Sequence, residues 1–314
     1  MKHILIDTDT ASDDAIALIM ALREPKVKVE GITVVAGNVG IEQALENALI
    51  SVEMADTYNV PVYKGAARPL LKHLHSSADI HGDDGMGNMH LAKPTTYAKE
   101  EHAVDAMIRL IEDSDVPMEL ITIGPLTNVA IACAKAPDVM RKLSKVYVMG
   151  GSGLGPGNVT PHAEFNIYAD GEAAQMVLEA GLNLYFVGWD VIVRDTFLSE
   201  HDIKRLMESD SSIAHFCMKV NGVRADFGFR QTGVKGLNMP DPAAIYAAFY
   251  PEIADFYRAE CRVEFRDQET YGKLHVKPCN KEHGNAWVCK KIHPDEAKLK
   301  LFELLGVPPK KNIL

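Results

Sequence analysis

Apolar segments of two lengths alternate along most of this chain, and that alternation limits its fold more than any other feature. Short, almost continuously apolar runs at 3–7, 27–35 and 118–123 are typical of buried strands, and the longer stretches after them have helical periodicity. Strands that are buried on both faces and joined by helices form parallel sheets. We therefore predict an α/β fold with a single open, mostly parallel (mixed) sheet and helices on both faces, in one domain over residues 1–314.

The remaining elements follow from the same patterns. Further strands are predicted at 60–63, 145–149 and 182–187, and helices at 13–23, 41–56, 100–112, 125–135, 171–180 and 294–305. A long polar loop is expected from 65 to 97, and a mostly helical region from 199 to 250. The runs 259–265 and 274–277 predict a hairpin added at an edge of the sheet.

Polar residues gather where the predicted strands end. Asp7 and Asp9 close the first strand, and Gly37-Asn38 closes the second. Gly124-Pro125 and the glycines at 150–151 follow two later strands. Ligands of open α/β sheets bind beyond the carboxyl ends of the strands, so these separate segments predict one common site there.

A segment of eight residues at the end of the first predicted strand contains four carboxylates, those of Asp7, Asp9, Asp13 and Asp14. Asp7 and Asp9 lie two apart on a strand and would share one face. Asp13 and Asp14 would begin a helix, where carboxylates cap free N–H groups. Capping accounts for one or two of these acids, whereas a hard cation, Ca²⁺ or Mg²⁺, accounts for all four, because both ions prefer oxygen ligands.

Three further segments offer candidate residues, each with an ordinary alternative. His81 lies in a glycine-rich polar loop and could donate a proton or bind a ligand, or be a plain surface histidine. Asn158, Glu164 and Asn166 suit a polyhydroxylated ligand such as a sugar, or could anchor their own loop. Asp241 precedes an apolar helix and fits an N-cap, with the following proline at the first helical position.

The charge and cysteine content exclude some classes of protein. The net charge of -10 would repel a phosphate backbone, so nucleic acid is not an expected partner. No apolar stretch approaches the ~20 residues of a membrane span, and the sequence starts without a signal-peptide pattern. The five scattered cysteines form no C-x-x-C pair and predict reduced thiols in a cytoplasmic protein.

Taken together, these segments resemble the inosine-uridine preferring nucleoside hydrolases. The resemblance covers nearly the whole chain, in the family's order. Its most specific part is the opening Asp7-x-Asp9-x-x-x-Asp13-Asp14. The supporting segments are Gly37-Asn38, Ile80-His81-Gly82, Gly124-Pro125-Leu126-Thr127-Asn128, Met149-Gly150-Gly151, Ala163-Glu164-Phe165-Asn166 and Asp241-Pro242.

This resemblance implies a Ca²⁺-dependent enzyme of nucleoside salvage or catabolism that hydrolyses the N-glycosidic bond of ribonucleosides to ribose and free base. Asp9 would be the general base on a metal-bound water, with Asp7 supporting the ligands. The implied metal ligands are Asp9, Asp14, Asp241 and the backbone carbonyl of Ile123. The implied sugar-binding residues are Asp13, Asn38, Met149, Asn158, Glu164 and Asn166. Members of the family are often homo-oligomers, dimers or tetramers.

The chain departs from the family pattern where the leaving base is activated. Relatives often carry a histidine or a tryptophan immediately before the aspartate equivalent to Asp241, whereas this chain has Pro240. Tyrosines that face the base in relatives are also missing from the segment 221–228. His81, Asn221 and Arg224 are therefore the nearest candidates for contacting the base, with His81 a candidate catalytic acid.

Two other functions remain open from the sequence. Asp7-Thr8-Asp9-Thr10 after an apolar strand imitates a phosphatase of the haloacid dehalogenase type, although Ala11 stands where that class needs threonine or valine. Pro240 gives weight to a non-catalytic nucleoside- or ribose-binding protein that keeps the Ca²⁺ site. Phosphate release from an aryl phosphate would identify the phosphatase, and turnover measured beside binding would identify the binding protein.

Overall fold

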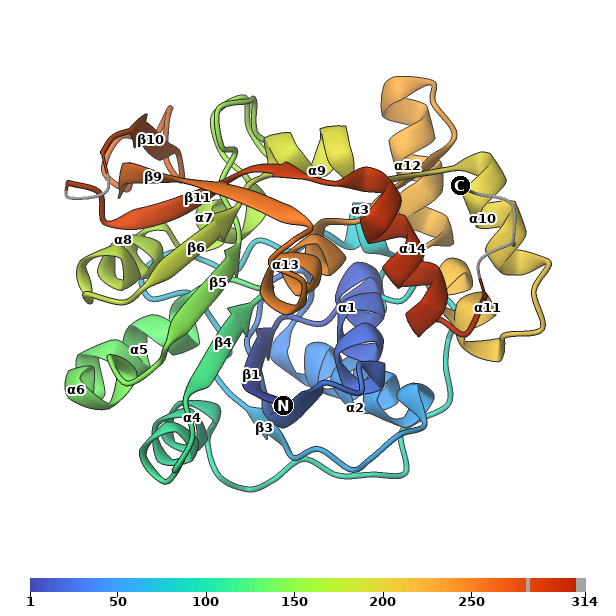
Figure 1. The fold of residues 1–314 in the computed structure, drawn as a ribbon, viewed down its shortest axis with the longest axis horizontal. Helices are drawn as coiled ribbons and strands as arrows, with labels where there is room; N and C mark the ends of the chain where they lie inside the picture. Colours follow the sequence, from blue (N-terminus) through green and yellow to red (C-terminus); the bar gives the residue numbers. More distant parts are fainter. Residues whose placement is uncertain (281–282, 309–314) are drawn as a thin grey trace.

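The computed structural model describes residues 1–280 and 283–308, and its centre is a nine-stranded sheet in the order β10-β9-β11-β6-β5-β4-β1-β2-β3 (Figure 1). The strands of this sheet are β1 (Lys2–Thr8), β2 (Val27–Val34), β3 (Val62–Lys64), β4 (Met118–Thr122), β5 (Lys145–Met149), β6 (Leu184–Val187), β9 (Ala254–Val263), β10 (Leu274–Pro278) and β11 (Ala286–Ile292). A separate pair is formed by β7 (Phe197–Ser199) and β8 (Gly236–Asn238).

The described helices are α1 (Ser12–Arg23), α2 (Ile41–Ala55), α3 (Ala78–His81), α4 (Ala103–Glu112), α5 (Thr127–Lys135), α6 (Pro137–Met140), α7 (Phe165–Ala169), α8 (Gly171–Glu179), α9 (Trp189–Asp195), α10 (Glu200–Met207), α11 (Ser212–Val220), α12 (Gly222–Thr232), α13 (Pro240–Phe249) and α14 (Pro294–Leu304). The helices predicted individually begin and end within a few residues of their predicted bounds, and these are α1, α2, α4, α5, α8 and α14. The helices α6, α7 and α9 were not predicted. The short helix α3 lies inside the predicted loop at 65–97.

The predicted mixed sheet is confirmed. All neighbouring strands from β3 to β11 run parallel, and only β9 is antiparallel to its two neighbours, β11 and β10. The predicted edge hairpin is β9 with β10. The strand β11, which lies between β9 and β6, was not predicted. Its pairing joins segments that are distant in the chain, so local periodicity carries little information about it.

Helices cover both faces of the sheet (Figure 1), and alternating side chains of β1 belong to the two cores on these faces. Ile4 and Ile6 join the core that contains α1, α2, α11, α13 and α14. Leu5, between them, joins the core that contains α4, α5 and α8. The prediction of helices on both faces is therefore confirmed, and β1 is enclosed from both sides.

The order of the strands reverses at β1. The chain adds β2 and then β3 on one side of β1, and β4, β5 and β6 on the other. Open α/β sheets bind ligands at such a reversal, beyond the carboxyl ends of the two strands, which here are β1 and β4. The topology therefore places the residues that follow β1 at the position best suited to a site.

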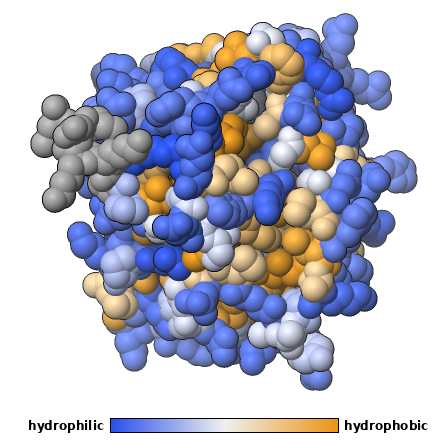
Figure 2. Space-filling model, turned by 90° about the vertical axis from the view of Figure 1, so that its right-hand side faces the viewer, coloured by the Kyte–Doolittle hydropathy of each residue, from blue (hydrophilic) through white to orange (hydrophobic). Residues whose placement is uncertain are grey.

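The face of the molecule that carries α10 and α11 is largely hydrophilic (Figure 2). On this face, an area of hydrophobic residues is bordered by hydrophilic ones (Figure 2). Among the described residues, no helix is both long and apolar enough to cross a membrane. Assembly into a dimer or tetramer stays a prediction.

Candidate active site

Five buried aspartates converge where β1 ends. Asp7 is in β1, Asp9 lies just beyond it, and Asp13 and Asp14 stand in the first turn of α1. Asp241 stands in the first turn of α13, which packs against α1. The N-cap of α13 is Met239, without a side-chain cap bond, so the capping alternative for Asp241 was wrong. Its carboxyl instead lies within 4.8 Å of the carboxyl of Asp14.

The backbone and short side chains around the cluster hold two of its carboxylates. Asp14 accepts from the Thr8 hydroxyl at 2.6 Å and from the backbone N–H of Ala11 at 2.9 Å, so it also caps α1. Oδ2 of Asp9 accepts the backbone N–H of Asn38 at 2.6 Å. A Cβ at Gly37 would lie 2.1 Å from that same oxygen, so only glycine allows this approach.

Asp7 supports the cluster from below. Its Oδ1 accepts from the Thr33 hydroxyl at 2.6 Å and from the Asn128 amide at 2.9 Å. The Asn128 amide also donates to the Val34 carbonyl. These bonds fasten the ends of β1 and β2 to the start of α5. Asn128 belongs to a motif that supports the family resemblance, but the sequence alone predicts no role for it.

The acid cluster fits a hard cation. Carboxylate oxygens of Asp13, Asp14 and Asp241 lie within 4.8 Å of one another. Oδ1 of Asp9 and Oδ1 of Asp13 are enclosed and have no hydrogen-bond partner among the described residues. Buried carboxylates this close repel one another unless protons or a cation neutralise them, and oxygen-only donors suit Ca²⁺ or Mg²⁺. Asp9, an implied metal ligand, lies outside this closest group, and Asp13 lies within it.

Burial and mutual repulsion change the acidity of the cluster. Burial, with smaller contributions from neighbouring carboxylates, raises the pKa values of Asp9 and Asp241 well above the usual range and that of Asp14 to about 7. Burial alone would also raise the pKa of Asp13, but Arg224 and His81 outweigh it and lower this pKa. In the absence of a cation, Asp13 is therefore the acid of the cluster that is held ionised.

The residues after β4 and β5 form the next part of the site. The Asn166 amide donates to the carbonyl of Ile123 at 3.2 Å and to that of Met149 at 3.1 Å. Glu164 accepts the backbone N–H groups of Gly151 and Asn166, and burial raises its pKa to about 7. The structure thus brings the strand ends together as predicted.

Two predicted sugar-binding amides also have structural bonds. Oδ1 of Asn158 accepts the backbone N–H of Phe165, which fits the loop-anchor alternative. Oδ1 of Asn38 accepts the Ser77 hydroxyl, and the Asn38 amide nitrogen has no partner among the described residues. That nitrogen remains available to a ligand.

His81, Asn221 and Arg224 meet beside Asp13. Nδ1 of His81 lies 2.8 Å from the Ser12 hydroxyl and 3.5 Å from Oδ1 of Asp13. Nη1 of Arg224 lies 3.5 Å from Oδ2 of Asp13. All three are buried, so the alternative of a surface histidine at His81 was wrong. Ser12 had no role in the sequence analysis, because nothing local shows that it meets a loop far along the chain.

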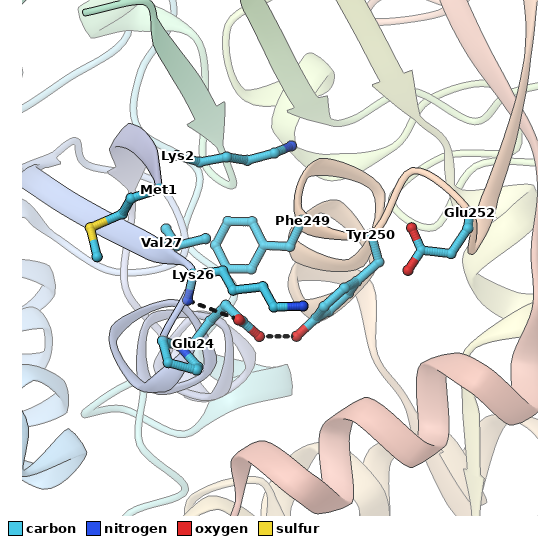
Figure 3. A pocket seen from close by; sticks show the side chains of 9 residues that line it. Met1, Lys2, Glu24, Lys26, Val27, Phe249, Tyr250 and Glu252 are labelled. Carbon is cyan, nitrogen blue, oxygen red and sulfur yellow. Dashed lines mark hydrogen bonds between the residues drawn. The ribbon is translucent and has the colours of Figure 1, made fainter.

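A separate cavity of about 630 Å³ lies at the opposite end of β1 (Figure 3). It is lined by Met1, Lys2, Glu24, Pro25, Lys26, Val27, Phe249, Tyr250 and Glu252. Glu24 and Tyr250 are hydrogen-bonded to each other there. This cavity holds no group of carboxylates like that at the carboxyl ends of the strands, so it does not compete with the acid cluster as the active site.

A buried group of carboxylates at the switch point of an open α/β sheet stands where such folds bind ligands, and its oxygen donors suit a hard cation. The model of the inosine-uridine preferring nucleoside hydrolase family matches residues 4–298. The chain belongs to this family.

Individual relatives and solved structures that are similar to the chain carry names of the same class of enzyme. A probable uridine nucleosidase 1 from Oryza sativa subsp. japonica is 35% identical over 83% of this chain and 81% of the relative. A pyrimidine-specific ribonucleoside hydrolase RihA from Enterobacter sp. (strain 638) is 33% identical over 86% of each chain. The solved plant nucleoside hydrolase PpNRh1 superposes with a TM-score of 0.91 at 27% identity, over 98% of this chain and 99% of that one. A purine-preferring ribonucleoside hydrolase from Gardnerella vaginalis gives 0.89, also at 27% identity, over 97% of this chain and 99% of that one.

Proposed function

We propose that this enzyme hydrolyses the N-glycosidic bond of ribonucleosides, with uridine as the first substrate to test. The observation that carries the proposal is the buried acid cluster with its partnerless oxygens on Asp9 and Asp13, in a chain of this family. The named uridine and pyrimidine specificities of the relatives favour uridine. The proposal treats the chain as one domain, because β11, near its end, pairs with β6 in its middle.

The proposed cation is Ca²⁺, held by Asp9, Asp14, Asp241 and the carbonyl of Ile123. When bound, Ca²⁺ would acidify a water molecule and orient the sugar hydroxyls. Asp9 is the proposed general base: the Asn38 N–H fixes its Oδ2, so its Oδ1 is left to take a proton from the attacking water. Asp7 holds the end of β1, next to Asp9, through its hydrogen bonds to Thr33 and Asn128.

The proposed sugar site surrounds these acids. Asp13 and the amide of Asn38 would bind ribose hydroxyls, with Met149, Asn158, Glu164 and Asn166 along the far side of the ring. Breaking the bond develops positive charge on the ribose, and preorganised carboxylates stabilise such charge. Asp13 suits this task because the guanidinium of Arg224 keeps it ionised.

The departing base needs a donor, and the proposed one is the neutral ring of His81. Burial lowers the pKa of His81 to about 4, so the ring is uncharged at neutral pH. Nδ1 faces Ser12 and Asp13, while Nε2 has no partner among the described residues. Nε2 can therefore donate a hydrogen bond to the base if the Ser12 hydroxyl donates to Nδ1.

His81→Ala is expected to lower kcat for uridine by about 10²-fold, at the lower end of what a proton-donating group contributes. It should spare p-nitrophenyl riboside, whose leaving group needs no proton. Steady-state kinetics on both substrates check this, with His90→Ala as control, because His90 is exposed. Equal losses on both substrates would instead assign His81 to binding or folding.

Ca²⁺ is expected to bind more tightly as the pH rises from about 5 to about 8. The raised carboxyl pKa values mean that the ion-free site holds protons that the cation must displace. A raised folded-state pKa stabilises the ion-free protein at low pH, and this stability is lost as the pH rises through about 7. Added Ca²⁺ should therefore raise Tm more at the higher pH.

Calorimetric titration with Ca²⁺, Mg²⁺ and Zn²⁺ at several pH values, in two buffers of different ionisation enthalpy, measures both affinity and proton release. Ca²⁺ should bind more tightly than Zn²⁺, since the donors are all oxygens. Affinity that falls with pH, or no binding at all, contradicts the proposed centre.

A further inference from the structure

Five buried side chains beside the acid cluster form a closed polar ring. Nη1 of Arg224 faces Oδ2 of Asp13 at 3.5 Å, and Nε of Arg224 donates to Oδ1 of Asn221 at 3.0 Å. The Asn221 amide donates to the Ser12 carbonyl at 2.7 Å. The Ser12 hydroxyl meets Nδ1 of His81, and His81 returns to Oδ1 of Asp13. This polar ring therefore joins the first turn of α1 to α3 and to the start of α12.

The helix α12 buries little of its surface, and besides Arg224 its Ala225 packs against the core, partly buried. Arg224 is its only buried residue, with 8% of its surface exposed. Two glycines, Gly222 and Gly228, lower its intrinsic helix propensity, and a Cβ at either position would meet no atom of another element within 4 Å. Helices in proteins depend mainly on tertiary packing of a buried face. Arg224 is therefore the main side-chain anchor of α12.

Arg224 also reaches the segment that leads to Asp241. Its second terminal nitrogen, Nη2, donates to the carbonyl of Asn238 at 2.7 Å, at the end of β8. All three nitrogens of its guanidinium thus face protein partners. Since these bonds occupy the group, they indicate a role that acts through Asp13 rather than through direct contact with the base.

We propose that Arg224 is a positioning residue, which fastens α12 beside the acid cluster and holds Oδ2 of Asp13 so that Oδ1 is left for a sugar hydroxyl. This inference rests on the proposed function, in which Asp13 binds ribose. Arg224 selects the orientation of that carboxylate, and His81 approaches the same carboxylate from the other side.

Three variants test the inference. Arg224→Met removes the charge, and Arg224→Lys keeps the charge but lacks the several donors of the guanidinium. Arg230→Met changes an exposed residue of the same helix and is the control. The measurements are kcat and KM for uridine and p-nitrophenyl riboside, inhibition by ribose, and hydrogen exchange of 222–232 against 212–220. Arg224→Met should raise both KM values and the ribose inhibition constant by a common factor of about 10 to 100, since a buried charge loses its partner. Hydrogen exchange in 222–232 should become faster, and kcat should change less than KM.

The same quantities in Arg224→Lys should lie between those of Arg224→Met and the wild type, and those of Arg230→Met should match the wild type.

Other results overturn the inference. Unchanged KM and ribose inhibition in Arg224→Met, or a fall in kcat for uridine alone, would exclude a role through Asp13, and the second result would assign Arg224 to the base. If Arg224→Met does not fold, the Arg224→Lys variant decides the question. A KM and a rate of hydrogen exchange in Arg224→Lys that equal those of the wild type contradict the proposal. A wild-type protein that releases no ribose from any ribonucleoside would refute the proposed function instead, while exchange in 222–232 would still test the anchoring of α12.

Discussion

Asp9→Asn is expected to lower kcat for uridine by about 10³-fold, within the range typical of a lost general base. The substitution keeps the size of the side chain and leaves an oxygen to accept the Asn38 N–H, but it removes the charge and the basic Oδ1. Protein that is folded, as judged by Tm, yet inactive on both uridine and p-nitrophenyl riboside is the expected result. The loss should extend to both substrates because the attacking water, and not the leaving group, is affected.

The matched control is Asp83→Asn, because Asp83 is exposed on the loop beside His81. Calorimetric titration of Asp9→Asn with Ca²⁺ separates two roles of the residue. A variant that still binds Ca²⁺ and has lost turnover supports Asp9 as base, whereas loss of both assigns it mainly to the cation. Retention of full activity would remove Asp9 from the mechanism.

2′-Deoxyuridine is expected to be hydrolysed with a kcat/KM about 10⁴-fold below that of uridine. A site built to bond hydroxyls leaves its own buried polar groups unpaired when a hydroxyl is absent, and discrimination of this order follows. Oδ1 of Asp13 and the amide of Asn38 are the groups left without partners here. Asp13 would then also remain a buried charge without the ligand it faces.

Competition assays with both compounds complete this test. 5-Methyluridine is a suitable control, because it changes the base and keeps every hydroxyl. Comparable kcat/KM for uridine and 2′-deoxyuridine would contradict a sugar site at Asp13 and Asn38, even if the enzyme proves active on ribonucleosides.

Much of the fold and part of the site follow from local sequence. The predicted strands of the parallel part of the sheet begin and end within a few residues of the observed ones, because strands buried on both faces are continuous apolar runs. The strand predicted at 259–265 instead begins at Ala254. The four acids from Asp7 to Asp14 lie together simply because one strand, a short turn and one helix start hold them. The Asp14 cap on Ala11 is equally local. The convergence of several strand ends follows from the parallel arrangement itself.

Only the tertiary structure decided which distant residues complete the site. Asp241 reaches Asp14 because α13 packs against α1, a contact between segments more than two hundred residues apart. Arg224 of α12 meets Asp13 of α1, and His81 of α3 meets Ser12 of α1, which are also contacts between different elements. β11 enters the sheet between strands that precede it in the chain. Such contacts depend on the packing of whole helices and strands, so no hydrophobic periodicity or motif in the sequence indicates them. The acids after β1, in contrast, are positioned by the local backbone that carries them.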